Sequence, residues 1–180
     1  YDVYLVDEFR TSCRCHNSFS ECEKFKKKTK SDIKLLIVGN KKWWPNSLEN
    51  TYQNLEHKTD IIFCGRQSDE MLAKLLGGAE ALTYLPFFEG FGIPLVEAMA
   101  CNTALISSAN SALKEVAGPG TLLVKENTPE QLGTAIRKFW EDEDLRQKSI
   151  KQNRNFVAQF KDQVIARQWM DTYHELAGHD

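Results

Sequence analysis

Short apolar runs separated by longer amphipathic stretches recur along the chain, and this alternation restricts it to few folds. The runs are unbroken, which is typical of strands buried on both faces. They predict strands at residues 3–6, 34–38, 60–64, 80–85, 103–107 and 121–124. The amphipathic stretches predict helices at residues 17–28, 47–57, 68–76, 93–101, 129–140, 143–160 and 163–176. Strands that alternate with helices form βαβ units, so we predict an α/β domain in which helices cover both faces of a parallel sheet.

Length and composition set the scale of this domain. The chain has 180 residues, enough for one α/β domain or for one half of a larger enzyme, and 42% hydrophobic residues allow a sizeable core. A net charge of −2 does not favour nucleic acid as a partner. The chain begins at Tyr1, inside an apolar run, and has no stretch resembling a signal peptide or a membrane span. We therefore expect a piece of a longer, cytoplasmic protein.

The cysteines favour reduced thiols over a disulfide framework. Their number, five, is odd, and they fall in unlike predicted contexts. Cys15 and His16 follow Cys13 closely, but a structural zinc site usually takes a second ligand pair, which the sequence lacks. We predict no metal site. The cysteines are Cys13, Cys15, Cys22, Cys64 and Cys101.

The segment from Glu89 to Ala100 has the features of a phosphate-binding turn. Gly90 precedes a predicted helix, and glycines there let the backbone approach a ligand closely. The start of that helix offers N–H groups and the positive end of a dipole, which suit a diphosphate. Pro94 fits the first helical turn, and Glu97 lies one turn further on. Two carboxylates, of Glu89 and Glu97, therefore flank this turn and can accept hydrogen bonds from sugar hydroxyls.

The spacing of two glutamates alone would favour a solvated loop residue and a locally paired helix residue. The whole string Glu-Gly-Phe-Gly-Ile-Pro-Leu-Val-Glu-Ala-Met-Ala at 89–100 is far more specific. It resembles the signature of the retaining glycosyltransferase family 4, also described as glycosyl transferases group 1. Members of that family have the two-domain GT-B fold. Further similar segments lie at 35–39, 61–66, 111–116, 122–124, 129–130 and 145–146, so the resemblance covers nearly the whole chain.

The resemblance assigns a role to each residue of the site. Glu89 is the expected catalytic residue and contacts hydroxyls of the donor sugar, while Glu97 binds the ribose. Gly65 and Arg66 line the base pocket. Leu95 packs near the base or ribose. The backbone N–H groups expected to face the sugar and the diphosphate belong to Phe91, Gly92 and Ile93.

The resemblance also implies the reaction. Residues 1–180 would be the C-terminal, Rossmann-like, nucleotide-sugar-binding domain of a GT-B enzyme. The enzyme would transfer a sugar with retention from a UDP- or GDP-sugar to a saccharide or lipid-linked acceptor, as in polysaccharide biosynthesis, without a metal cofactor. The N-terminal acceptor domain is absent, so we expect no efficient transfer by this domain alone. Membrane contact would occur only through the absent domain. The apolar cleft face of an isolated half favours self-association into a homo-oligomer.

The first strand departs from the family pattern. Asp7 and Glu8 stand where family members have glycine and often arginine, and His16 stands where they have lysine. Those cations stabilise the leaving nucleoside diphosphate. Arg14 or Arg10 is a candidate substitute, and Arg14 with His16 forms the expected cationic side of the donor site. The departures motivate an alternative, a catalytically degenerate glycosyltransferase-like module that binds nucleotide weakly or serves in assembly.

Two other interpretations concern smaller features. Asp7 and Glu8 faintly resemble the acidic cluster of a response-regulator-like or flavodoxin-like domain, but the string at 89–100 argues against that fold. Trp43 and Trp44 follow a strand, where they could stack on a ligand or, more in keeping with their size, pack on a missing domain. Helical spacing predicts core or interdomain contacts for Trp140, Trp169 and Tyr173.

Overall fold

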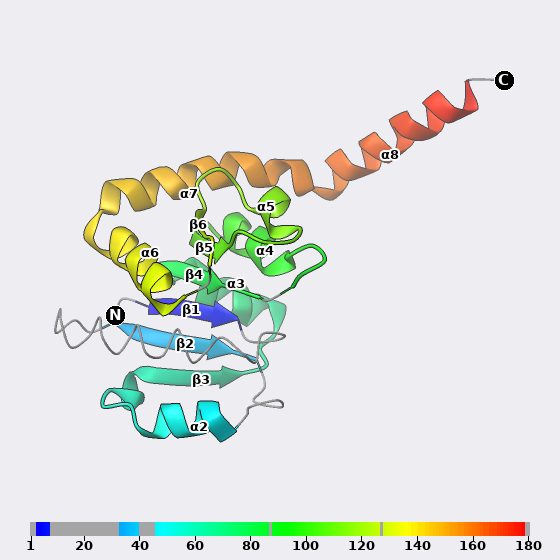
Figure 1. The fold of residues 1–180 in the computed structure, drawn as a ribbon. Coiled ribbons are helices and arrows are strands. Elements are labelled where there is room, and N and C mark those ends of the chain that lie inside the picture. The colour runs from blue at the N-terminus through cyan, green and yellow to red at the C-terminus, as the bar shows by residue number, and fades with distance from the viewer. Residues whose placement is uncertain (1–2, 8–32, 40–45, 87, 127, 179–180) are drawn as a thin grey trace.

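A parallel sheet forms the centre of the molecule. The computed structural model describes residues 3–7, 33–39, 46–86, 88–126 and 128–178. Within these residues, six strands lie in the order β3-β2-β1-β4-β5-β6, and every pairing is parallel (Figure 1). The chain builds outward from β1 in one direction and then, after β3, returns to the other side of β1. This is the doubly wound arrangement of Rossmann-like domains, so the predicted fold class is confirmed.

The strands agree with the predicted ones to within one residue at each end. One of these differences is at Asp60, which belongs to a short 3-10 turn, η1, at Lys58–Asp60. The strands are β1 (Val3–Asp7), β2 (Lys34–Val38), β3 (Ile61–Gly65), β4 (Ala81–Tyr84), β5 (Ala104–Ser108) and β6 (Leu122–Val124).

Most helices also follow the predictions. They are α2 (Asn46–Gln53), α3 (Asp69–Gly77), α4 (Ile93–Ala100), α5 (Leu113–Val116), α6 (Pro129–Glu141), α7 (Glu143–Val157), the 3-10 turn η2 (Ala158–Phe160) and α8 (Asp162–Ala177). Two helices differ from the predictions. The helix predicted over 47–57 begins one residue earlier, so that Ser47 lies in its first turn, and it ends at Gln53, four residues before the predicted end. The short helix α5 was not predicted. The helix predicted over 17–28 lies outside the described residues.

Side-chain caps explain where three helices begin. The Ser68 hydroxyl accepts the Met71 N–H at 3.3 Å at the start of α3, as predicted. Thr128 plays the same part for α6, immediately before Pro129 in the first turn. Asp142 accepts the Leu145 N–H at 2.8 Å, which separates α7 from α6. Each cap satisfies an N–H group that the helix itself cannot pair.

Two apolar clusters cover the two faces of the sheet. Leu35 and Ile37 of β2 point to one face and pack with residues of α2 and α6, including Phe139. Leu36 and Val38 point to the other face and pack with residues of α3 and α4. Because side chains alternate along a strand, two apolar layers require strands that are apolar at every position. This confirms the predicted layers of helices on both faces.

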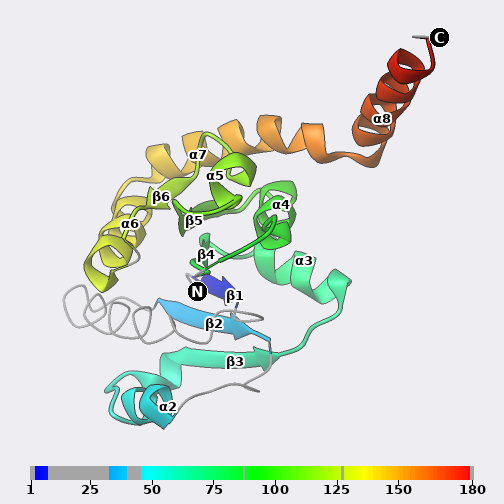
Figure 2. The same ribbon diagram turned by 45° about the vertical axis from the view of Figure 1, so that its right-hand side comes forward.

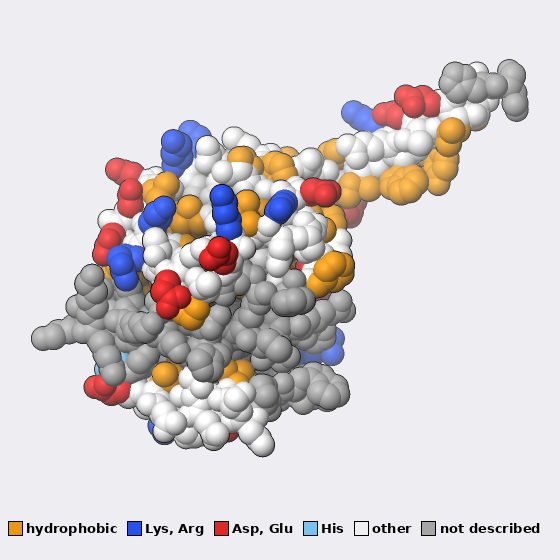
Figure 3. All heavy atoms as spheres, viewed as in Figure 1, with side chains coloured by type: hydrophobic (Ala, Val, Ile, Leu, Met, Phe, Trp, Pro, Cys, Tyr) orange, Lys and Arg blue, Asp and Glu red, His pale blue; other side chains and the backbone are white. Residues whose placement is uncertain are grey.

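The last two helices differ in how they contact the body of the domain. In α7, the buried Ser149 and Asn153 bind the loop that precedes β6, where the Gly120 N–H donates to the Asn153 Oδ1 at 2.8 Å. By contrast, α8 projects away from the other elements in two views (Figures 1 and 2), and all its described residues are exposed. Apolar side chains line one side of α8 (Figure 3), namely Val164, Ile165, Trp169, Met170, Tyr173 and Leu176.

The tryptophan predictions therefore divide. Trp140 packs against the core, as predicted. Trp169 and Tyr173 are 58% and 57% exposed and lie beside each other, with ring centroids 6.0 Å apart. A place in the core of this domain is wrong for those two, and their interdomain contact stays a prediction. Among the described helices, none combines the length and the apolar character that a membrane span needs.

Candidate functional site

The chain adds β2 and β3 on one side of β1 and then β4, β5 and β6 on the other side. The candidate site lies where this order reverses, between β1 and β4. These two strands are neighbours, with Val6 opposite Thr83. The chain continues from them to opposite halves of the sheet, and in sheets of this kind ligands bind beyond the carboxyl ends of the strands at such a point. Since all strands are parallel, the segments after β3, β4 and β5 reach the same edge. The predicted site residues after β3 and β4 are thus brought to one side of the molecule.

The two glycines before α4 have different local constraints. Gly92, the N-cap, has a φ of 98°, in the left-handed region. A Cβ at Gly92 would lie 2.5 Å from the Leu113 Cδ2, so a side chain there would strain the backbone and force the Leu113 side chain to shift. Gly90 is exposed, and a Cβ there would have no atom within 4 Å. Open space for a ligand is therefore a feature of Gly90, whereas Gly92 closes the turn onto the core.

The start of α4 presents polar backbone at this edge. In the described part of the chain, no hydrogen bond occupies the N–H of Gly92 or Ile93, while the Leu95 N–H is bound to the Gly92 carbonyl at 3.0 Å. Phe91 is 45% exposed, and its ring meets Phe160 edge-on with centroids 5.8 Å apart. The contact between the two rings thus packs the turn against Phe160. The N–H groups of the turn lie at the positive end of the α4 dipole, a position that suits an anion.

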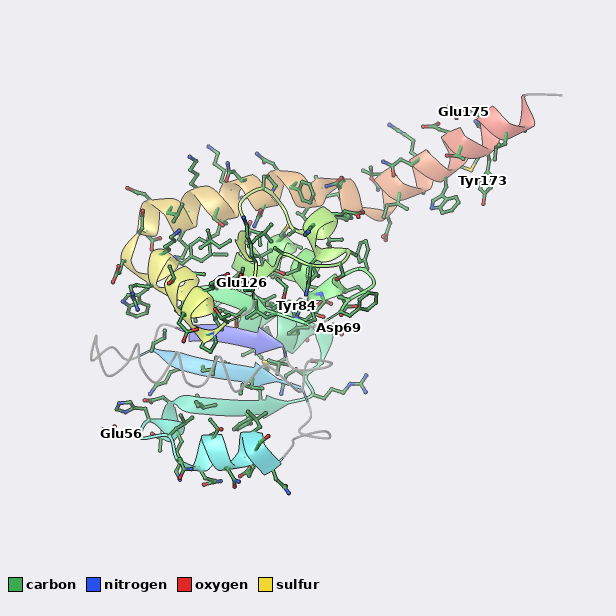
Figure 4. The ribbon with its side chains drawn as sticks, viewed as in Figure 1. Glu56, Asp69, Tyr84, Glu126, Tyr173 and Glu175 are labelled. Carbon is green, nitrogen blue, oxygen red and sulfur yellow. The ribbon has the colours of Figure 1, made fainter. Side chains whose placement is uncertain are left out.

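Glu89 is the most constrained side chain of the turn. Its Oε2 accepts a hydrogen bond from the Tyr84 hydroxyl at 2.7 Å, and its Oε1 accepts the Gly90 N–H at 3.2 Å. The Glu89 N–H donates to the Ser111 Oγ at 3.3 Å. Figure 4 shows Tyr84 at the end of β4, below the loops of the site. The carboxylate is half-buried and carries fixed contacts on both oxygens.

The last residue of β5 and the residues that follow it also bind this loop. The Ser108 hydroxyl donates to the Pro86 carbonyl at 3.2 Å, and the Asn110 side-chain amide donates to it at 3.4 Å. Ser111 has a φ of 45°, a left-handed conformation that is unfavourable for a residue with a Cβ. Ser111 begins the segment 111–116 that resembles the family, but no role was predicted for it, for Ser108 or for Asn110, because single serines and asparagines in a loop carry no distinctive pattern.

The two remaining predicted residues of α4 differ in exposure. Glu97 lies four positions after the exposed Ile93, on the same side of the helix, and is half-buried. Leu95 is fully buried in the cluster that supports Gly92. The predicted packing of Leu95 near the base or ribose does not fit this burial, because the α4 helix directs its side chain into the core. Leu95 instead supports the turn from beneath.

The end of β3 lies at the same edge of the sheet as the Glu89 loop, some distance from that loop. Gly65 has a φ of 65°, and its carbonyl accepts the Gly39 N–H at 2.9 Å. Arg66, next in the chain, is exposed. Three strand spacings of about 4.8 Å separate β3 from β4, so roughly 14 Å lie between Gly65 and the Glu89 loop. An extended ligand is needed to contact both, and a nucleotide with a diphosphate has that form.

The cationic side of the site cannot be placed. Arg14 and His16 lie outside the described residues, as do Glu8, Trp43 and Trp44, and their roles stay predictions. No group of three or more His, Cys, Asp or Glu side chains able to hold a metal ion occurs in the described part of the chain. Cys64 and Cys101 are free thiols, and burial raises the pKa of both, with the charge of Glu97 adding to the effect at Cys101.

Comparison with known proteins decides the family. The model of the family "Glycosyl transferases group 1" matches residues 3–156. The chain belongs to this family. Among curated group 1 glycosyl transferases, it is 32% identical over 145 residues to the O-antigen chain mannosyltransferase RfbU of Salmonella typhimurium and 26% identical over 148 residues to O-antigen chain mannosyltransferase B of Escherichia coli. The matches cover 81% and 82% of the chain, but only 40% and 39% of those proteins.

Solved structures of other glycosyltransferases share the fold. The sucrose-phosphate synthase of Thermosynechococcus elongatus superposes with a TM-score of 0.82 over 99% of this chain and 46% of its own, at 24% identity. Anabaena HepE in complex with UDP-glucose gives a TM-score of 0.82 over 97% of this chain and 49% of its own, at 17% identity. The chain thus spans about two fifths of the curated relatives and under half of these larger structures.

Proposed function

We propose that this chain is the donor-binding domain of a glycosyltransferase. The enzyme transfers a sugar, with retention, from a nucleoside-diphosphate sugar to a saccharide or lipid-linked acceptor. In this proposal the diphosphate lies at the start of α4, Glu89 contacts the donor sugar as the catalytic residue, and Glu97 binds the ribose. The base lies toward Gly65 and Arg66. Arg14 and His16 complete the site as its cationic side.

One observation carries the proposal: a constrained carboxylate stands beside a polar helix start at the switch point of the sheet. The half-buried Glu89 and the open space at Gly90 share one turn. An anionic group suits the helix start, and a carboxylate suits hydroxyl donors. A nucleotide sugar carries both groups next to each other. Membership of the glycosyl transferases group 1 family supports the same ligand.

The acceptor domain is proposed to be the part of the relatives that this chain does not cover. The chain spans 39% and 40% of the two O-antigen relatives. In this proposal the apolar side of α8 contacts that domain, and transfer by residues 1–180 alone is inefficient. The free thiols of Cys64 and Cys101 support the cytoplasmic location proposed from the sequence.

A second candidate, a degenerate module, is favoured by the acidic end of β1. The backbone of Asp7 pairs with Val38 as the last residue of that strand, so an acidic residue occupies the carboxyl end of β1, next to the site. A carboxylate there opposes the binding of a diphosphate. The module would fold normally and bind nucleotide weakly or not at all.

Calorimetry separates the two candidates. The chain is titrated with UDP, GDP, UDP-glucose and GDP-mannose, and its folding is checked by circular dichroism. Mannose is included because it is named in several relatives, and UDP-glucose because it is bound in HepE. Saturable binding of one nucleotide and of its sugar conjugate supports the donor domain. A folded chain that binds none of the four ligands supports the module.

The role of Glu97 has its own test. Replacing Glu97 with Gln keeps its shape but removes the charge that accepts the ribose hydroxyls. We expect the affinity for the free nucleoside diphosphate to fall by about tenfold, the effect of one hydrogen bond to a charged group. Glu115→Gln, an exposed glutamate of α5, is the matched control and should leave the affinity unchanged. Equal affinities for Glu97→Gln and the unmodified chain would refute the ribose contact.

A further inference from the structure

We infer that Tyr84 is a positioning residue that orients the Glu89 carboxylate toward the donor sugar. The inference rests on the proposed function, because Glu89 is a sugar contact only if the chain binds a nucleotide sugar. It adds a buried side chain of β4 to the predicted site. The evidence is the geometry of the hydroxyl–carboxylate contact and the way the tyrosine ring is held.

The ring of Tyr84 is part of the rigid core. Tyr84 is the last residue of β4 and is 4% exposed. It belongs to the same buried cluster as Leu82, Leu95 and Leu105. Its hydroxyl reaches out of this cluster to the Glu89 Oε2 at 2.7 Å. A loop carboxylate is thereby tied to a fixed point on the sheet before any ligand arrives, and sites whose supports are locked by packing bind with less loss of freedom.

The hydrogen bonds of the Glu89 carboxylate leave some of its acceptor positions open. An ionised carboxylate has about four acceptor positions, two on each oxygen. One position on Oε2 is taken by the Tyr84 hydroxyl, and one on Oε1 by the Gly90 N–H. Each oxygen therefore keeps an acceptor position. Two such positions on one fixed carboxylate suit two neighbouring hydroxyls of a sugar ring. Tyr84 therefore affects the binding of the sugar and not that of the nucleotide.

This division between sugar and nucleotide makes the inference testable. A tyrosine that only stabilises the fold would affect both parts of the ligand equally. A tyrosine that acts through Glu89 affects the sugar alone, because the proposed nucleotide contacts are at Glu97, at Gly65 and at the start of α4. Replacing Tyr84 with Phe keeps the buried ring and removes only the hydroxyl.

The experiment is calorimetry on the full chain with a nucleoside diphosphate and its sugar conjugate, UDP with UDP-glucose and GDP with GDP-mannose. For Tyr84→Phe we expect about tenfold weaker binding of the sugar conjugate and a change of less than about twofold for the free diphosphate. The control is Thr103→Val, which removes another buried hydroxyl, one that donates to the Leu76 carbonyl at 2.7 Å. The control should change the two affinities equally or not at all.

A double-mutant cycle identifies Glu89 as the link. In a Glu89→Gln background, the additional effect of Tyr84→Phe on the sugar conjugate should shrink to less than about twofold, because residues that act through one contact are not additive. Equal effects in both backgrounds, or equal losses for the diphosphate and its conjugate, would overturn the inference while leaving the proposed function intact. A chain that binds no nucleotide at all overturns both.

Discussion

Gly90 and Gly92 stand two positions apart in one turn, yet the structure constrains them differently. Gly92 combines a φ of 98° with a would-be Cβ only 2.5 Å from Leu113. Gly90 has open space around its Cα and is exposed. The first glycine of the motif therefore leaves room at the surface, and the second lets α4 begin against the core. The pair of alanine variants separates the two functions.

Gly92→Ala should lower the free energy of unfolding by about 2–4 kcal/mol, because it adds left-handed backbone strain to a clash in the core. Gly90→Ala should change it by less than about 0.5 kcal/mol. Urea unfolding followed by circular dichroism measures both values. A Gly92→Ala variant as stable as Gly90→Ala would contradict the geometry of the turn.

Single residues were the hardest features to predict. The string at 89–100 singled out Glu89, Glu97 and the glycines, because the whole string is specific although the spacing of the two glutamates alone is not. Tyr84 escaped notice, since an aromatic residue in an apolar strand is typical of any core. Leu95 was placed at the ligand, although its position in the helical repeat points it inward. The direction of one side chain depends on the packing around it, which a single sequence does not show.

At the scale of elements, α7 secures the loop before β6. The Ser149 hydroxyl donates to the Gly120 carbonyl at 2.6 Å, and the Asn153 side chain binds the Gly120 N–H and the Thr121 hydroxyl. A Cβ at Gly120 would come within 2.2 Å of the Ser149 backbone oxygen, so helix and loop are in close contact. The two bonds to Gly120 are buried and connect segments about thirty residues apart in the chain.

Asn153→Ala should therefore destabilise the domain by about 2–3 kcal/mol, because it leaves the buried Gly120 N–H without its partner. Gln152→Ala, an exposed neighbour on the same helix, should cost less than about 0.5 kcal/mol. Chemical denaturation of the two variants provides the measurement. If both cost the same, the contact between α7 and the loop does not stabilise the fold.

The tryptophans of α6 and α8 provide a second pair. Trp140→Ala removes a ring that packs against the core and should cost on the order of 2 kcal/mol. Trp169→Ala removes a ring that is 58% exposed and should leave the stability of this domain unchanged within about 0.5 kcal/mol. Both values come from thermal unfolding monitored by near-UV circular dichroism. A large loss for Trp169→Ala would show that α8 packs on the domain in solution.

Element prediction succeeded where a local pattern was long or had a cap. The continuous apolar strands and the Ser68 cap of α3 appeared as predicted. The helix α5 has four residues, too few for a helical period to show. Ser47 was a reasonable cap by type, but the helix begins one residue earlier, at Asn46. The limits of short elements depend on tertiary contacts more than on local sequence.

At the scale of the molecule, alternation of strands and helices predicted a parallel sheet but not the strand order. The order β3-β2-β1-β4-β5-β6 follows from the reversal after β3, and this long-range choice is not visible in any local pattern. The reversal places the switch point of the sheet beside the Glu89 loop. The strand order thus explains why residues from separate motifs meet at one edge.

Ligand binding at that edge should stabilise the whole chain. A nucleotide sugar that binds only the folded state adds about 2.7 kcal/mol at a concentration one hundred times its Kd. We expect a higher melting temperature with the conjugate that calorimetry selects, and a smaller rise for Glu97→Gln at the same concentration. Differential scanning fluorimetry provides the measurement. An equal rise for both proteins would indicate binding that does not involve Glu97.

A crystal structure of the chain soaked with its nucleotide sugar tests the central claim most directly. The account predicts electron density for the diphosphate against the backbone of residues 90–93 at the start of α4, with the ribose at Glu97 and the sugar at Glu89. Density for the ligand at any other part of the surface, with this edge of the sheet unoccupied, would contradict it.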